Sequence, residues 1–194
     1  HNRIADLLGF FNRLYIRGIS LAEFYDEILV KLEGKVISDG SDLNLKGYRL
    51  NLVRSNLRAA LHFFFLSLES GRPNGRTALC VSPVPDAGLP LQIMSCIYRE
   101  EGWECLALRE PCNLKMMREC VKNEPVNLLS VWLPVDYKVD PEMEQREKLV
   151  KFLQHYRIPV VVIQKQTHSR ILKEYYSERS VRTFSQFQSF IKSL

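Results

Sequence analysis

The fold is decided by residues 77–90, TALCVSPVPDAGLP. Residues 77–81 form a short apolar run that predicts a buried strand, and a helical pattern follows over residues 89–100. Residues 81–90 therefore form the loop between the first strand and first helix of an α/β domain. Ligands of open α/β sheets usually bind beyond the carboxyl ends of the strands. This loop is our candidate ligand site, although it contains no histidine and no glycine-rich phosphate cradle.

The rest of the C-terminal region alternates between strand-like and helical patterns. The further apolar runs are residues 103–108, 127–133 and 159–163. The further helical windows are residues 113–122 and 141–155, and a weaker strand at 181–184 precedes a short helix at 186–192. Nearly continuous apolar runs are typical of strands buried on both faces of a parallel sheet. With right-handed crossovers, they predict a flavodoxin-like, doubly wound parallel sheet of five strands over residues 76–194.

Residues 1–70 predict a helical bundle. The first apolar stripe comprises Ile4, Leu7, Leu8, Phe11 and Leu14, and the second comprises Leu21, Phe24, Ile28 and Leu32. Between them, Gly18 ends the first helix, and Ser20 with Glu23 forms a capping box. Residues 33–46 have loop composition, and a long helix is predicted over 45–67. The segment GRPNG at residues 71–75 marks the boundary between the two domains.

Composition excludes several classes of protein. The chain has 194 residues, of which 46% are hydrophobic, and a net charge of +5. No apolar run approaches the roughly 18 residues of a membrane span, and no secretory signal is visible. We therefore expect a cytoplasmic protein with no membrane partner. Because the first residue is His1 rather than Met, we also expect a fragment of a longer protein.

The cysteines predict buried free thiols in a reducing compartment. They are Cys80, Cys96, Cys105, Cys112 and Cys120. Their number is odd, and no C-x-x-C pair occurs, which argues against zinc or disulfide chemistry.

One local excess of positive charge occurs near the C-terminus, at Lys165, Arg170, Lys173, Arg179 and Arg182. A solvated basic face explains it, and contact with DNA or an acidic partner is the alternative.

Enzyme chemistry has little support in the sequence. Neither a dinucleotide-binding motif nor a P-loop follows the first strand. Asp86 and Asp136 lie roughly where a phosphoryl-accepting receiver carries aspartates, but the acidic pair is missing. Ser82 has no nucleophile-elbow context, and His168 follows the fourth strand. An enzyme of this kind, for example a phosphate-handling α/β protein, would require Ser82, Asp86, Asp136 and His168 to converge.

Several segments resemble a known family. Residues 19–29 and 54–61 look like its second and last bundle helices, residues 80–83 like the end of its first strand, and EGWEC at 101–105 like its G-W-x-V approach to strand two. The family is the cobalamin-binding sensory module of MerR-type transcription regulators of the CarH/LitR kind. The resemblance covers residues 19–194 and implies a helical bundle, a flavodoxin-like domain and a ligand cleft between them.

The cobalt-ligating motif of this family, D-x-H-x-x-G, is degenerate in the chain. Without gaps, its three defining positions fall on Pro85, Ala87 and Pro90. A one-residue gap restores Asp86 but places Gly88 at the histidine position. The upper-face bundle motif is also missing, and its counterparts are Ile37 and the pair Gly47-Tyr48. The resemblance therefore implies a preserved fold without the imidazole that binds cobalt.

We expect a non-catalytic sensory domain that controls oligomerisation or DNA binding. DNA would be bound through a domain outside this sequence, and the partners would be a second copy, a regulatory protein or a small-molecule effector. The cleft candidates are Ser82, Asp86, Ala87, Gly88, Tyr48, Asp136 and His168. No cofactor or metal is expected. A corrinoid carrier or a haem-binding sensor is the alternative, with His62, His155, His168 and Cys112 as candidate axial ligands, although we expect His62 to be a core residue.

Overall fold

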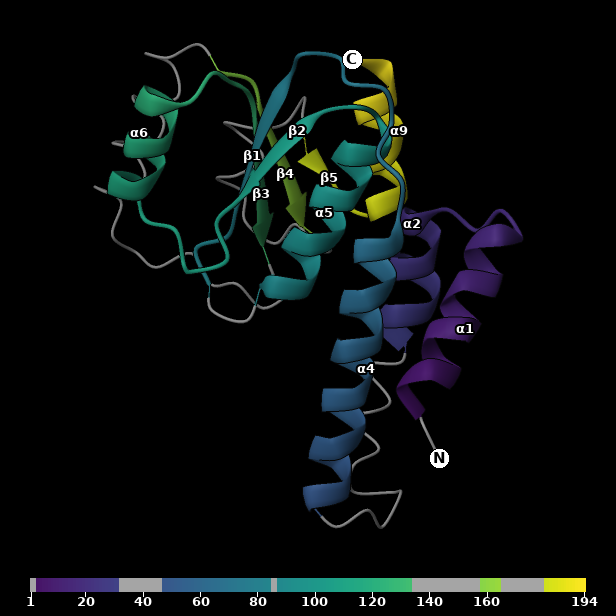
Figure 1. Ribbon diagram of the computed structural model, residues 1–194. Coiled ribbons are helices and arrows are strands. Elements are labelled where there is room, and N and C mark those ends of the chain that lie inside the picture. The colour runs from purple at the N-terminus through teal and green to yellow at the C-terminus, as the bar shows by residue number, and fades with distance from the viewer. Residues whose placement is uncertain (1–2, 32–46, 85–86, 134–157, 165–179) are drawn as a thin grey trace. The chain divides into compact units, whose positions relative to one another are not determined.

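Figure 1 shows the computed structural model, which describes residues 3–31, 47–84, 87–133, 158–164 and 180–194. The chain divides into two compact units, His1–Glu69 and Ser70–Leu194. The predicted loop at 33–46 and helix at 141–155 lie outside the described residues.

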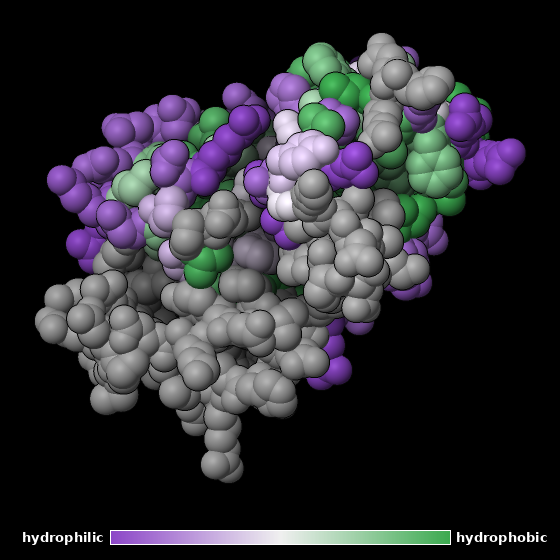
Figure 2. All heavy atoms as spheres, turned by 90° about the horizontal axis from the view of Figure 1, so that it is seen from below, coloured by the Kyte–Doolittle hydropathy of each residue, from purple (hydrophilic) through white to green (hydrophobic). Residues whose placement is uncertain are grey.

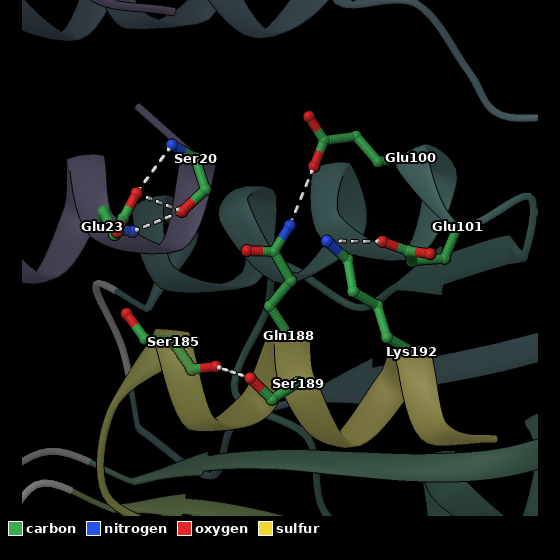
Figure 3. Close-up of polar contacts among 8 residues, drawn as sticks. All are labelled: Ser20, Glu23, Glu100, Glu101, Ser185, Gln188, Ser189 and Lys192. Carbon is green, nitrogen blue, oxygen red and sulfur yellow. Dashed lines mark hydrogen bonds and ion pairs between the residues drawn. The ribbon is translucent and has the colours of Figure 1, made fainter. Parts of the chain in front are cut away.

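The first unit is helical throughout its described part. Helix α1 spans Arg3–Ile16, and Gly18 beyond it adopts a φ of 88°. The capping box is confirmed: the Glu23 backbone N–H donates to Ser20 Oγ at 3.2 Å, and the Ser20 N–H donates to the Glu23 carboxylate at 3.0 Å (Figure 3). This cap begins α2, Leu21–Glu23.

Helix α2 continues directly into a π-helical turn, η1, Phe24–Leu29. The predicted stripe assumed regular α-helical spacing and expected Ile28 in the core. Phe24 is buried as predicted, but the wider turn buries Leu29, five residues later, and leaves Ile28 only half-buried. A π-turn adds one residue to the turn, which moves the buried face along the chain by one position.

The core of the helical unit is aromatic. Helix α4, Gly47–Ser67, packs along α1. The centroid of the Phe64 ring lies 5.9 Å from that of Phe11 and 5.5 Å from that of Phe24. The Phe11 and Phe24 rings are 5.2 Å apart and meet edge to face. All three side chains are almost fully buried. Tilted and edge-on aromatic pairs at this separation are favourable, so this cluster holds the described helices together.

The second unit is an α/β domain with a parallel sheet, as predicted. Its strands are β1 (Thr77–Val81), β2 (Glu104–Ala107), β3 (Val126–Leu133), β4 (Val160–Gln164) and β5 (Ser180–Val181). All pairings are parallel, in the order β2-β1-β3-β4-β5. This is the flavodoxin-like order of a doubly wound sheet. The predicted strand at 181–184 is wrong beyond its first residue, because Phe184 begins a helix.

Helices cover both faces of this sheet. Helices α5 (Gly88–Glu100) and α9 (Phe184–Ser193) lie on one side, and α6 (Leu114–Asn123) lies on the other (Figure 1). Side chains that alternate along the strands separate the two cores. Leu79, Val81 and Leu129 pack with Met117 of α6. On the opposite side, Gln188 of α9 donates to Glu100 of α5 at 3.4 Å, beside the ion pair of Lys192 with Glu101 at 3.7 Å (Figure 3).

The turn between α5 and β2 requires glycine. Gly102 has a φ of 77°, and a Cβ there would lie 2.0 Å from the carbonyl oxygen of Arg72. Its own carbonyl accepts the Asn74 N–H at 2.9 Å. Only glycine combines a positive φ with so close a backbone approach, which explains the glycine of the EGWEC segment.

Candidate functional site: the loop after β1

The loop after β1 lies at the topological switch point of the sheet. Strand β1 is bordered by β2 on one side and β3 on the other. The chain leaves β1 toward β2 through α5, and it reaches β3 through α6. Loops diverge where the direction of winding reverses, and crevices for ligands form there. The described part of this loop comprises residues 82–84 and 87.

Ser82 has a structural role in this loop. Its side chain is 1% exposed, and its Oγ accepts the Val84 N–H at 3.3 Å. Its carbonyl accepts the Cys112 N–H at 2.8 Å, which joins the loop to the segment before α6. A nucleophilic serine needs its hydroxyl aimed at a base and at a substrate. The observed bonds indicate a side chain that closes a turn.

Ala87 occupies the start of α5. It is fully buried, its carbonyl accepts the Leu91 N–H at 3.0 Å, and no side chain caps the helix there. Pro90 lies in the first turn, where a missing N–H is tolerated. A Cβ on Gly88 would meet nothing within 4 Å. Neither Ala87 nor Gly88 has a side-chain atom that could bind a metal.

None of the remaining cleft candidates lies in the described part of this loop. Asp86, Asp136 and His168 lie outside the described part of the chain. Tyr48 belongs to the helical unit, where it is 63% exposed and its hydroxyl accepts a hydrogen bond from Arg49 Nε at 3.1 Å. The predicted cleft between the two domains and the convergence of Ser82 with the three others both stay predictions.

The expectation that His62 is a core residue is wrong. The buried face of α4 carries Ala60, Leu61, Phe64 and Phe65, and His62 lies exposed on the other side. Residues two positions apart on a helix point in very different directions, so an aromatic neighbourhood in sequence does not bury this imidazole.

Most of the other haem-ligand candidates and most of the basic cluster lie outside the described residues. Of these candidates Cys112 is described, and burial raises its pKa to about 11. His155 and His168 lie outside the described residues, as do four of the five basic residues near the C-terminus; Arg182 is described and exposed.

Within the described ranges, no group of three or more His, Cys, Asp or Glu residues is arranged to hold a metal ion. No helix in those ranges is long and apolar enough to cross a membrane.

A second polar cluster, which the sequence did not predict, lies beneath α5. Cys80 Sγ of β1 and Cys105 Sγ of β2 are 3.4 Å apart, and Ser95 of α5 donates to Cys105 Sγ at 3.1 Å. Beside them, the hydroxyls of Tyr98 and Ser130 lie 2.5 Å apart. The residues come from four elements, so only the strand order brings them together.

Burial and hydrogen bonding affect these groups differently. Burial raises the pKa of Cys80 and of Tyr98 well above the ordinary values. The hydrogen bond from Cys80 lowers the pKa of Cys105, and the Ser95 hydroxyl and the Arg99 charge act in the same direction. A thiolate that receives hydrogen bonds is stabilised relative to its thiol. These hydrogen bonds therefore favour the thiolate form of Cys105.

Comparisons with known proteins give a fold-level likeness. No protein family profile and no curated protein match this sequence. One similar solved structure is the methanol:cobalamin methyltransferase complex MtaBC from Methanosarcina barkeri, with a TM-score of 0.49 and 11% identity over 99% of this chain and 74% of that one. Another is a cobalamin-binding protein from Desulfitobacterium hafniense, with a TM-score of 0.47 and 11% identity over 98% of this chain and 96% of that one. Structural similarity at these TM-scores does not assign a function to this chain. The fold assignment rests on the strand order of its own sheet.

Proposed function

We propose that this chain is a non-catalytic sensory module of a transcription regulator, with a cobalamin-binding-like fold that does not ligate cobalt. The observation that carries the proposal is Ala87: it is fully buried at the start of α5, where the resembled family has its histidine. Its methyl side chain cannot supply a nitrogen to a metal.

Hydrogen bonds on both sides of the loop hold this position. The Ser82 carbonyl accepts the Cys112 N–H at 2.8 Å, and the Ala87 carbonyl accepts the Leu91 N–H at 3.0 Å. Sliding the loop by one residue would break these bonds and would bring Gly88 to the ligand position. Both alignments therefore lead to a loop without an imidazole, which supports a fold kept for assembly or for a different small molecule.

Exposed apolar side chains on the helical unit support a role in assembly. They include Phe10 and Ile16 of α1 and Tyr48, Leu52, Phe63 and Leu66 of α4, each at least 41% exposed. Figure 2 shows hydrophobic atoms in green at the surface among hydrophilic ones. Exposed apolar patches mark interaction sites more often than scattered single residues do. In this proposal, these side chains contact a second copy or a regulatory partner, and a DNA-binding domain outside this sequence receives the signal.

Spectroscopy tests the proposal. Purified protein is mixed with hydroxocobalamin or haemin, passed over a desalting column, and examined by absorbance and native mass spectrometry. We expect neither compound to be retained at one molecule per chain, and we expect a dimer or larger assembly. Stoichiometric retention of either compound with an imidazole-ligated spectrum would overturn the degenerate-site interpretation. A strict monomer at micromolar concentration would overturn the assembly role.

A further inference from the structure

The thiol pair beneath α5 lies away from the loop after β1 and has no part in the proposed function. Cys80 and Cys105 come from adjacent parallel strands, and their Sγ atoms are 3.4 Å apart. Ala78 pairs with Cys105, and Cys80 pairs with Ala107. The two cysteines are therefore diagonal neighbours on the same face of the sheet, and their side chains lean toward each other across the strand pair.

This register opposes a disulfide. Strands about 4.8 Å apart, with a rise of about 3.3 Å per residue, place two Cα atoms with a two-residue offset about 8 Å apart. Disulfides usually join Cα atoms about 4.4–6.8 Å apart. Cys80 and Cys105 could be joined directly only if β1 and β2 moved, and both strands are held in the parallel ladder.

The same register accommodates an atom between the two sulfurs. A metal–sulfur bond is about 2.3 Å long, so a linear S–metal–S bridge separates the sulfurs by about 4.6 Å. The sulfurs now lie 3.4 Å apart, so binding requires the two side chains to rotate apart by about 1 Å. Soft thiolates select soft ions such as copper(I). A divalent zinc site would need four ligands, and the described residues offer no cluster of even three.

The surrounding charge suits a monovalent ion. Two thiolates and one single positive charge leave a net charge of −1, which is costly in an apolar interior. The Arg99 guanidinium of α5 donates to Cys96 Sγ at 3.2 Å, so a positive charge lies on the helix that covers the thiol pair. Cys80 is fully buried, whereas the Cys105 residue is partly exposed on the edge strand β2.

We infer that Cys80 and Cys105 form a two-thiolate site for a soft monovalent metal ion of the copper(I) type. Each thiol that ligates the ion releases its proton to solvent, so loading releases up to two protons and changes no oxidation state. Ser95 then donates to the bound Cys105 sulfur and positions it.

Competition with a copper(I) chelator tests the site. The reduced full chain is titrated without oxygen, and bound copper is examined by X-ray absorption. We expect one copper(I) per chain with two sulfur neighbours. Cys105→Ala and, separately, Cys80→Ala should weaken binding by more than about tenfold, because each removes a ligand. Cys120→Ala, on α6, is the matched control and should bind as the parent does.

Alanine at the buried position keeps an apolar side chain, and thermal melts of each variant confirm folding before titration. Equal binding by folded Cys105→Ala and the parent would overturn the inference, as would the absence of binding to the parent. A mild thiol oxidant provides an independent test. If it joins Cys80 to Cys105 in the folded chain, as shown by peptide mass, the register argument fails and the pair is a redox switch instead.

Discussion

The hydroxyls of Tyr98 and Ser130 lie 2.5 Å apart in the buried layer between α5 and β3. Tyr98 is fully buried, and its ring also contacts Trp103 and Phe187, at centroid distances of 5.4 Å each. One hydrogen bond therefore satisfies two buried polar groups in a layer where apolar contacts surround them. Removing one partner leaves the other unpaired, which is the costly case for a buried polar group.

Tyr98→Phe should destabilise the α/β unit by about 1–3 kcal/mol, because Ser130 loses its partner while the ring packing is kept. Urea unfolding monitored by circular dichroism measures the change. The double variant Tyr98→Phe with Ser130→Ala should recover part of the loss, since no hydroxyl is then left unpaired. A Tyr98→Phe protein as stable as the parent would show that the bond contributes nothing.

Gly102→Ala should destabilise the same unit by more than about 2 kcal/mol, because it adds a Cβ at a positive φ and 2.0 Å from the Arg72 carbonyl oxygen. Gly75→Ala, in the same unit, is the matched control. Gly75 also has a positive φ, 75°, but a Cβ there would meet nothing within 4 Å, so its change should stay near 1–2 kcal/mol. Denaturant midpoints of the two variants compare them directly, and equal losses would refute the steric argument.

Local signals in the sequence were enough to predict that the C-terminal unit is an α/β domain with a parallel sheet. The apolar run 77–81 matches β1 residue for residue, since a short run bounded by turn residues leaves few alternatives. The capping box at Ser20 was equally readable, because both partners lie within one helical turn. Both features are formed by residues that are close together in the sequence, so a single sequence is enough to predict them.

Features that depend on tertiary packing were missed. The burial of Leu29 in place of Ile28 follows from a π-turn, and the exposure of His62 follows from which face of α4 meets α1. The contact between Cys80 and Cys105 joins residues 25 positions apart. Its existence depends on the register of β1 with β2, and a one-residue slip would turn one of the thiols to the opposite face.

The stability of the helical unit should depend on pH through Glu23. Hydrogen bonds from the Ser20 backbone and hydroxyl lower the pKa of this carboxyl in the folded chain. At pH values above the ordinary glutamate pKa, the ionised Glu23 carboxylate therefore stabilises the folded chain. This contribution is lost as the pH falls through the lowered pKa of the folded state. Thermal melts of Glu23→Gln should show a smaller drop in acid than melts of the parent. Parallel pH profiles for the two proteins would contradict this.

Replacement of two adjacent phenylalanines on α4 should have very different effects on stability. Phe64 is fully buried among Phe11 and Phe24, whereas Phe63 is 52% exposed. Phe64→Ala should destabilise the helical unit by about 3–5 kcal/mol, and Phe63→Ala should stay within about 0.5 kcal/mol. Urea titrations check both values. In sedimentation experiments, Phe63→Glu should reduce self-association if the exposed side chains form the assembly surface, and unchanged assembly would place that surface elsewhere.

Gly88 offers the position at which a metal ligand can be restored with least disturbance. A Cβ there meets nothing within 4 Å, whereas Ala87 is fully buried and has no room for an imidazole. If the loop is a cobalamin site that lacks only its ligand, Gly88→His should gain retention of hydroxocobalamin and an imidazole-ligated absorbance spectrum. Gly88→Gln, of similar size, should not. If Gly88→His folds and retains no more cobalamin than Gly88→Gln does, the loop has lost more than its histidine, and the ligand of this module belongs to a different chemical class.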